Sequence, residues 1–229
     1  MYDVDFISYE ESNAEENWQR LLYKVTRAKR LHGVTGLHQA HIAAANIVNT
    51  EMFYVVDGDA VIEETFEFDY TAPYHQLDHV HVFRARNPVN DLVYGYGAVK
   101  LLPTAEVKLL VNKDFKPDMT SSINRKYKII HELSNVTAFD TDPYNTWRSA
   151  FRECAKLASG VIDGQVNTET LQRLETWCSV GHGSAYGRSC VYGAQAGRQF
   201  GLDSRGTDHL MKINDWAWMR EQYETDATP

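Results

Sequence analysis

Three strand patterns and two helical patterns alternate in the first sixty residues, and this alternation limits the possible folds more than any other feature. Residues 4–9, 30–34 and 52–56 are rich in apolar, β-prone side chains, as strands are. Between them, residues 15–25 and 38–48 have apolar or small side chains at helical spacing. A βαβαβ order is typical of a parallel sheet that binds ligands at the carboxyl ends of its strands. The sequence therefore predicts an α/β fold.

The start of the first helix has the form of a capping box. Ser12 is followed three residues later by Glu15. In a capping box each of these side chains bonds to the backbone N–H at the position of the other. We therefore expect Ser12 to be the N-cap.

The third strand runs directly into two aspartates. Asp57 and Asp59 are two residues apart, and such side chains on an extended backbone point to the same side. Gly58 between them lets a ligand approach the backbone closely. Paired carboxylates suit Mg²⁺ or Mn²⁺, which keep coordination positions open for substrate phosphates. The pattern predicts a metal–diphosphate site; the alternative is an Asp-Gly turn that closes a hairpin.

Length and charge narrow the class of protein. The chain has 229 residues, 43% of them hydrophobic, which is typical of one large folded domain. Its net charge of −8 opposes strong non-specific binding to nucleic acids. A basic strip remains possible if Arg84, Arg86, Arg125 and Lys126 gather on one face.

Cysteine usage and hydropathy indicate the compartment. The chain has no apolar run near 18 residues, and it begins with the acidic residues Asp3 and Asp5. Its three cysteines lack the spacing of zinc sites, so we expect reduced core thiols. The sequence predicts a cytoplasmic protein that does not partner with a membrane.

The segment from Gly36 to Asp59 resembles the central signature of GT-A nucleotide-sugar glycosyltransferases. In that family, a helix with an Ala-Arg-Asn-x-Gly-like pattern leads into a strand ending in Asp-x-Asp. Ala40-His41 falls on the family's Ala-Arg, and Thr50-Glu51 falls on the pair before the strand. His41 departs from the family by replacing Arg. The resemblance implies a mixed, mostly parallel sheet flanked by helices, with a helical C-terminal part.

The resemblance also implies an activity and a set of donor-site residues. Asp57 and Asp59 would hold Mn²⁺ or Mg²⁺ against a nucleotide-sugar diphosphate, with His41 at the position that faces the donor phosphates. Tyr9 and Glu10 lie where the fold places the base and ribose. A UDP-sugar is the default donor of such enzymes.

An aromatic–glycine segment is a further candidate for the donor site. Tyr94 and Tyr96 alternate with two glycines, which suits stacking on a sugar ring or a base. It resembles a loop that some GT-A enzymes use for donor and acceptor. The alternative is a twisted edge strand with its tyrosines in the core. Lys100 is a candidate to neutralise the diphosphate.

The second half offers candidates for the acceptor base and a further metal ligand. Asp142-Pro143 has the form of a helix start, and Asp142 or the nearby Asp140 could take the acceptor proton. Many GT-A enzymes take a metal ligand from a late histidine, which makes His182 and His209 candidates.

The compact chain, with its segments 87–103 and 141–157, is similar to small glycosyltransferases encoded by tailed bacteriophages. Some of these enzymes modify hydroxymethylated pyrimidines in phage DNA. This resemblance makes 5-hydroxymethylpyrimidine DNA a candidate acceptor, with a glycan or small molecule as the alternative. If the chain is phage-encoded, its compartment would be the host cytoplasm.

Other functions fit parts of the same pattern. Haloacid-dehalogenase-like phosphatases also place Asp-x-Asp after an apolar strand, but on the opening strand. A nucleotidyltransferase would need a glycine-rich loop, which residues 9–13 lack. A non-catalytic nucleotide-binding protein is the remaining alternative.

We expect a single catalytic domain of residues 1–229. Residues 1–110 would form the nucleotide-sugar and metal half, and residues 111–229 the acceptor half with a helical lobe. The tail, residues 224–229, is expected to be frayed. The oligomeric state is open.

Overall fold

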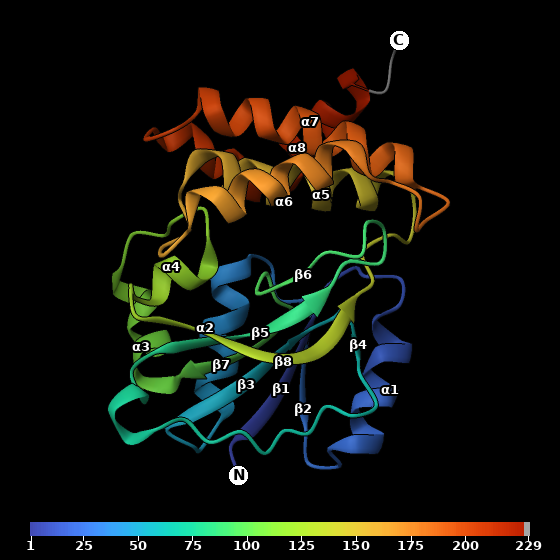
Figure 1. Ribbon diagram of the computed structural model, residues 1–229. Coiled ribbons are helices and arrows are strands. Elements are labelled where there is room, and N and C mark those ends of the chain that lie inside the picture. The colour runs from blue at the N-terminus through green and yellow to red at the C-terminus, as the bar shows by residue number, and fades with distance from the viewer. Residues whose placement is uncertain (227–229) are drawn as a thin grey trace. The chain divides into compact units, whose positions relative to one another are not determined.

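A computed structural model describes residues 1–226, and the chain divides into two compact units (Figure 1). Unit 1 is made of residues 1–87, 93–115 and 122–138. Unit 2 is made of residues 88–92, 116–121 and 139 onward. That the whole chain forms one catalytic domain stays a prediction.

Unit 1 is built on an eight-stranded sheet with the order β2-β1-β3-β7-β5-β8-β4, in which β6 also pairs with β5. The strands are β1 (Asp3–Ser8), β2 (Lys29–His32), β3 (Met52–Asp57), β4 (Ala60–Ile62), β5 (Val80–Arg86), β6 (Val93–Tyr94), β7 (Val99–Pro103) and β8 (Tyr127–Thr137).

The βαβαβ order predicted for the first sixty residues is confirmed. Helix α1 (Ala14–Lys24) connects β1 to β2, and α2 (Leu37–Ile47) connects β2 to β3. Because β2 and β3 lie on opposite sides of β1, right-handed crossovers put the two helices on opposite faces of the sheet. Figure 1 shows α1 and α2 flanking these strands from different sides.

The sheet is mixed. The pairs β1–β2, β1–β3 and β5–β8 are parallel, whereas β3–β7, β5–β7, β5–β6 and β4–β8 are antiparallel. The parallel arrangement expected from the alternating pattern is therefore found among β1, β2 and β3, where each crossover connection contains a helix.

The capping box at the first helix does not form, so this prediction is wrong. The N-cap of α1 is Asn13, whose side chain makes no capping bond. Glu15 instead accepts a hydrogen bond from Arg30 of β2, with 2.5 Å between Nη1 and Oε2. The tertiary ion pair takes the carboxylate that the local motif would have used.

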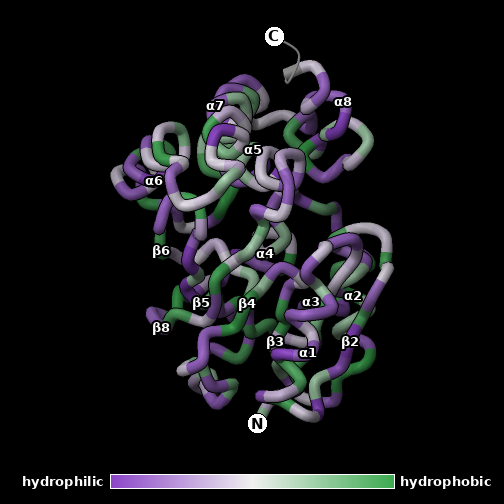
Figure 2. Tube along the Cα trace, turned by 90° about the vertical axis from the view of Figure 1, so that its right-hand side faces the viewer, coloured by the Kyte–Doolittle hydropathy of each residue, from purple (hydrophilic) through white to green (hydrophobic). Residues whose placement is uncertain are grey.

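The α1 face of the sheet carries a hydrophobic core. Phe6, Tyr54 and Phe83 are completely buried there against Leu21 of α1 and Phe66. Figure 2 shows hydrophobic (green) stretches within the strands and hydrophilic (purple) stretches mostly outside them. Three short helical segments, α3 (Thr104–Lys108), η1 (Tyr74–Gln76) and η2 (Leu109–Asn112), complete unit 1.

Unit 2 is helical, as predicted for the last third of the chain. Its elements are α5 (Pro143–Ser159), α6 (Asn167–Ser179), α7 (Gly187–Asp203), η3 (Asp208–Asn214) and α8 (Trp216–Asp226); the short α4 (Met119–Ile123) spans the boundary with unit 1. Since α8 reaches Asp226, Glu224 and Thr225 are helical; residues 227–229 of the expected frayed tail lie outside the described part. In residues 1–226 no helix has the length and apolar character needed to cross a membrane.

Helices α5 and α7 pack backbone to backbone. A Cβ on Gly193, Gly197 or Gly201 would lie 2.2, 2.1 or 2.4 Å from a carbonyl oxygen of α5. These glycines recur every four residues, so they share one face of α7. Trp147 and Phe151 of α5 pack with Leu210 and Ile213 and form the core of unit 2.

Candidate functional site

The carboxyl ends of β1 and β3 form the candidate site in unit 1. The two strands are parallel neighbours, and Ile7 lies opposite Asp57. The chain leaves β1 toward one side of the sheet and enters β3 from the other, so the strand order reverses here. Open α/β sheets bind ligands in the crevice at such a reversal. The loop 9–13 and the segment 57–59 therefore meet where a ligand is expected.

The segment Asp57-Gly58-Asp59 does not close a hairpin, so that alternative is wrong. Strand β3 pairs with β1 and β7, whereas β4 leaves to pair with β8. The Asp57 N–H donates to the Ala98 carbonyl at 2.8 Å, and the Asp59 carbonyl accepts from the Ala138 N–H at 2.7 Å. Both aspartates are thus fixed by tertiary backbone contacts, with their side chains partly exposed.

Glu11 and Asn17 are two residues of this site that the sequence analysis missed. A Cβ on Gly58 would lie 2.7 Å from Glu11 Oε2 and 3.1 Å from Ser8 Cβ, so only glycine fits here without displacement. Asn17 donates to the Gly58 carbonyl at 2.9 Å. Asn17 interrupts the apolar face of α1, which was a usable signal; nothing in the sequence distinguishes Glu11 from Glu10.

Lys100 is the positive charge at the site. Its Nζ lies 2.9 Å from Asp57 Oδ2, and the lysine side chain is only 10% exposed. Burial raises the pKa of Asp59 to about 7, and the negative charges of Asp57 and Glu11 add to the rise, while Lys100 opposes it. Three carboxylates thus face one ammonium. Burial is the main cause of the raised pKa of Asp59, and Asp57 and Glu11 each contribute more to it than Lys100 offsets.

The side chains of this site supply some of the ligands that a divalent cation needs. Asp57 and Asp59 are hard oxygen ligands of the kind that Mg²⁺ and Mn²⁺ prefer, and both ions commonly use one or two carboxylates plus substrate phosphates. Residues 1–226 contain no group of three or more His, Cys, Asp or Glu side chains placed to hold a metal ion. The remaining ligands would therefore come from substrate and solvent.

His41 is buried beside this charged pair. It is completely buried on α2, and one ring nitrogen, Nδ1, lies 2.8 Å from the Leu37 carbonyl. Burial, reinforced by Lys100, lowers the pKa of His41 to about 4. The ring is therefore neutral, Nδ1 donates to Leu37, and Nε2 is a lone-pair acceptor that meets no partner among residues 1–226. At neutral pH His41 does not supply the positive charge of the arginine that it replaces.

The residues expected to contact the nucleotide lie in the loop after β1. Tyr9 is half-buried and its N–H donates to Glu11 Oε2 at 2.7 Å. Glu10 is exposed. Glu11 thus folds back toward Gly58, and a role of Tyr9 and Glu10 in nucleotide binding stays a prediction.

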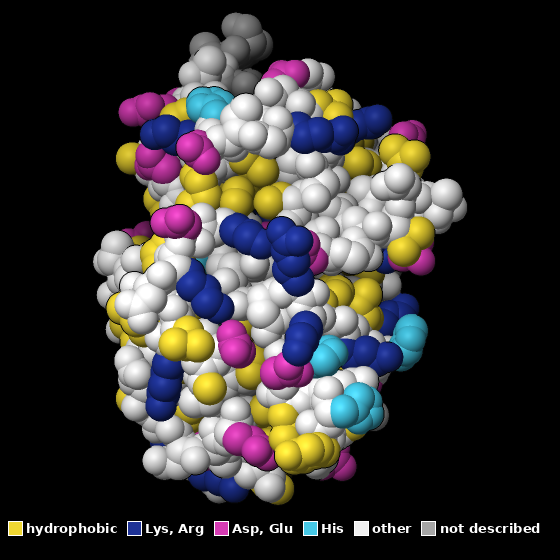
Figure 3. Space-filling view, turned by 90° about the vertical axis from the view of Figure 1, so that its left-hand side faces the viewer, with side chains coloured by type: hydrophobic (Ala, Val, Ile, Leu, Met, Phe, Trp, Pro, Cys, Tyr) yellow, Lys and Arg dark blue, Asp and Glu magenta, His cyan; other side chains and the backbone are white. Residues whose placement is uncertain are grey.

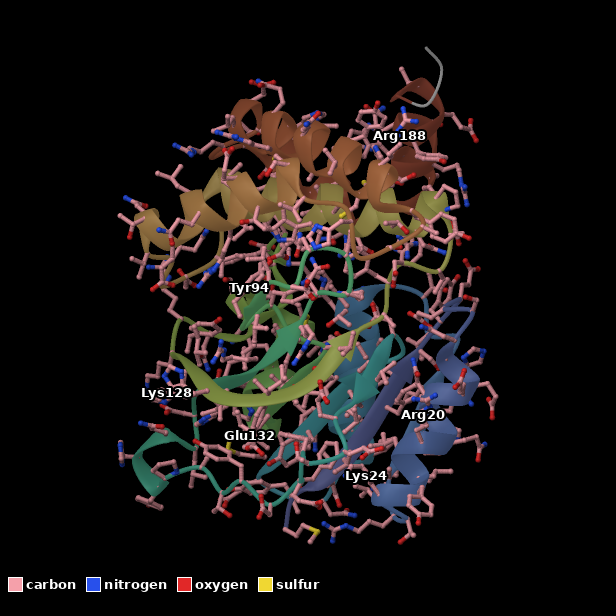
Figure 4. The ribbon with its side chains drawn as sticks, turned by 45° about the vertical axis from the view of Figure 1, so that its right-hand side comes forward. Arg20, Lys24, Tyr94, Lys128, Glu132 and Arg188 are labelled. Carbon is pink, nitrogen blue, oxygen red and sulfur yellow. The ribbon has the colours of Figure 1, made fainter. Side chains whose placement is uncertain are left out.

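Tyr94 and Tyr96 stack on each other. Their ring centroids are 4.6 Å apart and their planes differ by 25°. Tyr94 is buried and ends β6, which fits the alternative of a strand with its tyrosine in the core; stacking on a sugar ring or a base stays a prediction. The stretch ends beside Asp57, because Ala98 accepts from the Asp57 N–H. Figure 4 labels Tyr94 above β8, apart from Lys128 and Glu132 of that strand.

The remaining candidates belong to unit 2. Both carboxylate oxygens of Asp142 accept hydrogen bonds from Asn145, one from its N–H at 2.8 Å, so the predicted N-cap of α5 is confirmed. Asp140 is half-buried near Cys190. His182 is exposed, 3.8 Å from Asp91, and His209 packs against the rings of Phe200 and Trp218. Within unit 2 these residues form no common cluster.

The four basic residues considered for a nucleic-acid strip do not gather. Arg125 and Lys126 precede β8 beside the start of β5, where Val80 donates to the Lys126 carbonyl. Arg84 and Arg86 lie further along β5, four and six residues after Val80, or about 13 and 20 Å at the usual strand rise. Lys126 also forms an ion pair with Asp78. Figure 3 shows Lys and Arg side chains on one face interspersed with acidic and uncharged ones.

Comparison with known proteins leaves the family of this chain open. The sequence matches no protein-family model and no curated protein. Among solved structures, one match is a protein from Bacillus anthracis, named as a glucose-1-phosphate thymidylyltransferase and solved in complex with a sucrose. It is 14% identical, covers 57% of this chain and 68% of its own, and has a TM-score of 0.34.

Proposed function

We propose that this protein is a metal-dependent glycosyltransferase that moves a sugar from a nucleotide-sugar donor to an acceptor hydroxyl. The observation that carries the proposal is the meeting of Asp57, Asp59 and Glu11 with Lys100 at the reversal between β1 and β3. A crevice with excess carboxylates and one lysine suits a metal ion and a diphosphate together. A UDP-sugar is the proposed donor, by the resemblance of the Gly36–Asp59 segment to GT-A enzymes.

Asp57 and Asp59 would hold Mn²⁺ or Mg²⁺, which would offset the negative charge that develops on the leaving nucleotide. Lys100 would add a second positive charge by exchanging Asp57 for a phosphate oxygen. The distance of 2.9 Å from its Nζ to Asp57 Oδ2 supports this exchange. Tyr9 and Glu10 would contact the base and ribose, and the neutral Nε2 of His41 would accept a hydrogen bond at the buried side of the site.

For the acceptor base we propose Asp140. Both carboxylate oxygens of Asp142 already accept hydrogen bonds from Asn145 at the start of α5, so they are less available to an acceptor hydroxyl. Asp140 precedes the helix and carries no such capping role. His182 or His209 as a further metal ligand stays a proposal without a supporting contact.

For the acceptor we propose a hydroxyl of a glycan or small molecule, with 5-hydroxymethylpyrimidine DNA as the alternative. Two observations favour a glycan or small molecule. The net charge is −8, and the pair Arg84 and Arg86 is separated from the pair Arg125 and Lys126. Sugar transfer from UDP-sugars to hydroxymethylated DNA and to simple glycans, measured side by side, distinguishes the two.

The donor site is tested by calorimetric titration with UDP and with GDP, with and without Mn²⁺. We expect UDP binding that depends on Mn²⁺ and is lost in Asp59→Asn. Asp69→Asn changes an exposed aspartate of the same unit and is the matched control, which should bind as the unchanged protein does. If neither nucleotide binds under any metal condition, the proposed donor site is wrong.

A further inference from the structure

The three cysteines of unit 2 meet where three helices pack. Cys154 lies on α5, Cys178 on α6 and Cys190 on α7, and all three are free thiols. The thiols of Cys154 and Cys178 are hydrogen-bonded to each other, and Cys190 interacts electrostatically with both. Two of the thiols are therefore in direct contact although 24 residues separate them in the sequence.

Cys178 is the accessible member of this cluster. It is half-buried, whereas Cys154 and Cys190 are completely buried. Its carbonyl accepts a hydrogen bond from Gln195 Nε2 of α7 at 2.9 Å. Arg198 lies three residues further along α7, on the same side of that helix, and bonds to the Cys178 thiol. The contact between α6 and α7 thus holds a guanidinium against one sulfur.

These contacts distinguish the three thiols chemically. The hydrogen bond from Cys154 lowers the pKa of Cys178 to about 7, with further help from Arg198, against burial and the nearby Glu175. Burial raises the pKa of Cys190 to about 12 and that of Cys154 well above its usual value. At neutral pH about half of Cys178 is then thiolate, the nucleophilic form, while its neighbours stay protonated.

We propose that Cys178 is an oxidation-sensitive thiol and that Cys154 resolves it, so that unit 2 forms a reversible disulfide between α5 and α6. The oxidant class is a peroxide. The Cys178 thiolate attacks one peroxide oxygen, the O–O bond breaks, and a sulfenic acid forms while the released hydroxide takes a proton to become water. The Cys154 sulfur then attacks the Cys178 sulfur. An S–S bond forms, the S–O bond breaks, and the hydroxyl leaves with the Cys154 proton as a second water.

The products are tested on the full chain with stoichiometric hydrogen peroxide at pH 7, followed by alkylation and non-reducing peptide mass spectrometry. We expect a Cys154–Cys178 disulfide that dithiothreitol removes, in the unchanged protein and in Cys190→Ser alike. Cys154→Ser should instead give a sulfenic acid on Cys178 that dimedone traps. A persistent Cys178 thiol, or a disulfide that uses Cys190, would overturn the proposal.

The role of Arg198 is tested by the rate of Cys178 alkylation with iodoacetamide at pH 7. The Cys154 hydrogen bond is the larger cause of the lowered pKa and remains in Arg198→Met, so the pKa of Cys178 should rise only part of the way and the rate should fall about threefold. Arg198→Lys keeps a positive charge and should lose less. Arg188→Met, an exposed arginine of the same helix labelled in Figure 4, is the control and should leave the rate unchanged. Equal rates in all four proteins would contradict the assignment.

Discussion

Lys100 gives the Asp-Gly-Asp segment a property that its residues alone do not have. Its ammonium lies 2.9 Å from Asp57, where a divalent cation would also bind. Lys100 and a metal ion must therefore compete for the Asp57 carboxylate unless a second anion forms an ion pair with Lys100. A diphosphate can do so, and metal and diphosphate should then bind more tightly together than separately.

Replacing this lysine tests the competition. In Lys100→Met, Mn²⁺ should bind about tenfold more tightly without nucleotide, or about 1.4 kcal/mol, because Asp57 is left without its partner. The affinity for UDP in the presence of Mn²⁺ should fall, because one positive charge is lost. Both are measured by calorimetry. The control is Lys128→Met, an exposed lysine of β8; weaker Mn²⁺ binding in Lys100→Met than in this control would contradict the competition.

Asp5 is a residue whose complete burial the sequence did not indicate. It is completely buried in β1, and neither carboxylate oxygen has a hydrogen-bond partner in residues 1–226. Burial raises its pKa to about 7, with Lys29 opposing the rise and Asp3 adding to it. A carboxyl whose pKa is higher in the folded state is easier to ionise after unfolding.

The free energy of unfolding should therefore fall as pH rises from about 4 to about 7, by as much as about 4 kcal/mol from Asp5 alone. Asp5→Asn removes this titration. We expect the variant to be more stable than the unchanged protein at pH 8, with the difference shrinking toward pH 5. Urea unfolding at pH 5 and at pH 8 measures the stability of both proteins. A stability difference independent of pH would show that Asp5 is ionised in the folded protein.

At the scale of elements, α7 has a packing face that its hydrophobic pattern does not predict. Cys190 and Ala194 of this helix are buried, and Gly193, Gly197 and Gly201 form the face that meets α5. Glycine is a poor helix former in isolation, so regularly spaced glycines do not by themselves predict a packed helix face. Glycine is required at these positions because the backbones of α5 and α7 lie too close together for a Cβ.

Gly197→Ala tests that close approach. The added Cβ would lie 2.1 Å from the Phe151 carbonyl oxygen, and a backbone atom cannot move aside cheaply. We expect a loss of about 3 kcal/mol in the free energy of unfolding, although alanine favours an isolated helix by about 1 kcal/mol. The exposed Gln199→Ala on the same helix should change stability by less than about 0.5 kcal/mol. Equal stability of the two variants, measured by urea unfolding, would rule out the tight contact.

The strands, too, are only partly predictable from the sequence. Strands β1, β3 and β5 are recognisable because their apolar residues follow each other or alternate. Their pairing is not recognisable in the same way: β7 pairs antiparallel with both β3 and β5, which no local pattern indicates. Strand pairing depends on contacts between residues far apart in the sequence.

At the scale of the whole molecule, each unit has its own hydrophobic core. Phe6, Tyr54 and Phe83 belong to the core of unit 1, and Trp147 and Phe151 to that of unit 2. Units with separate cores can lose structure separately. The two proposals are independent for this reason: the donor site uses unit 1, and the thiol pair uses unit 2.

Hydrogen exchange of the full chain tests this independence. Gly197→Ala should lower the protection of amides in α5 and α7 and leave that of β1, β3 and β7 unchanged, because the substitution lies in unit 2 only. Conversely, UDP with Mn²⁺ should slow exchange at the ends of β1 and β3. An equal loss of protection in both units would show that they unfold as one.

The sequence by itself determined the βαβαβ opening, the strand that ends in Asp57, the Asp142 cap and the helical last third. These follow from apolar spacing and side-chain-to-backbone bonds within a few residues of each other. Tertiary structure alone decided that Lys100 pairs with Asp57, that Glu11 rather than Glu10 faces Gly58, and that Cys154 meets Cys178. Each of these contacts joins separate elements, and its geometry depends on strand register and helix packing, which no single stretch of the chain encodes.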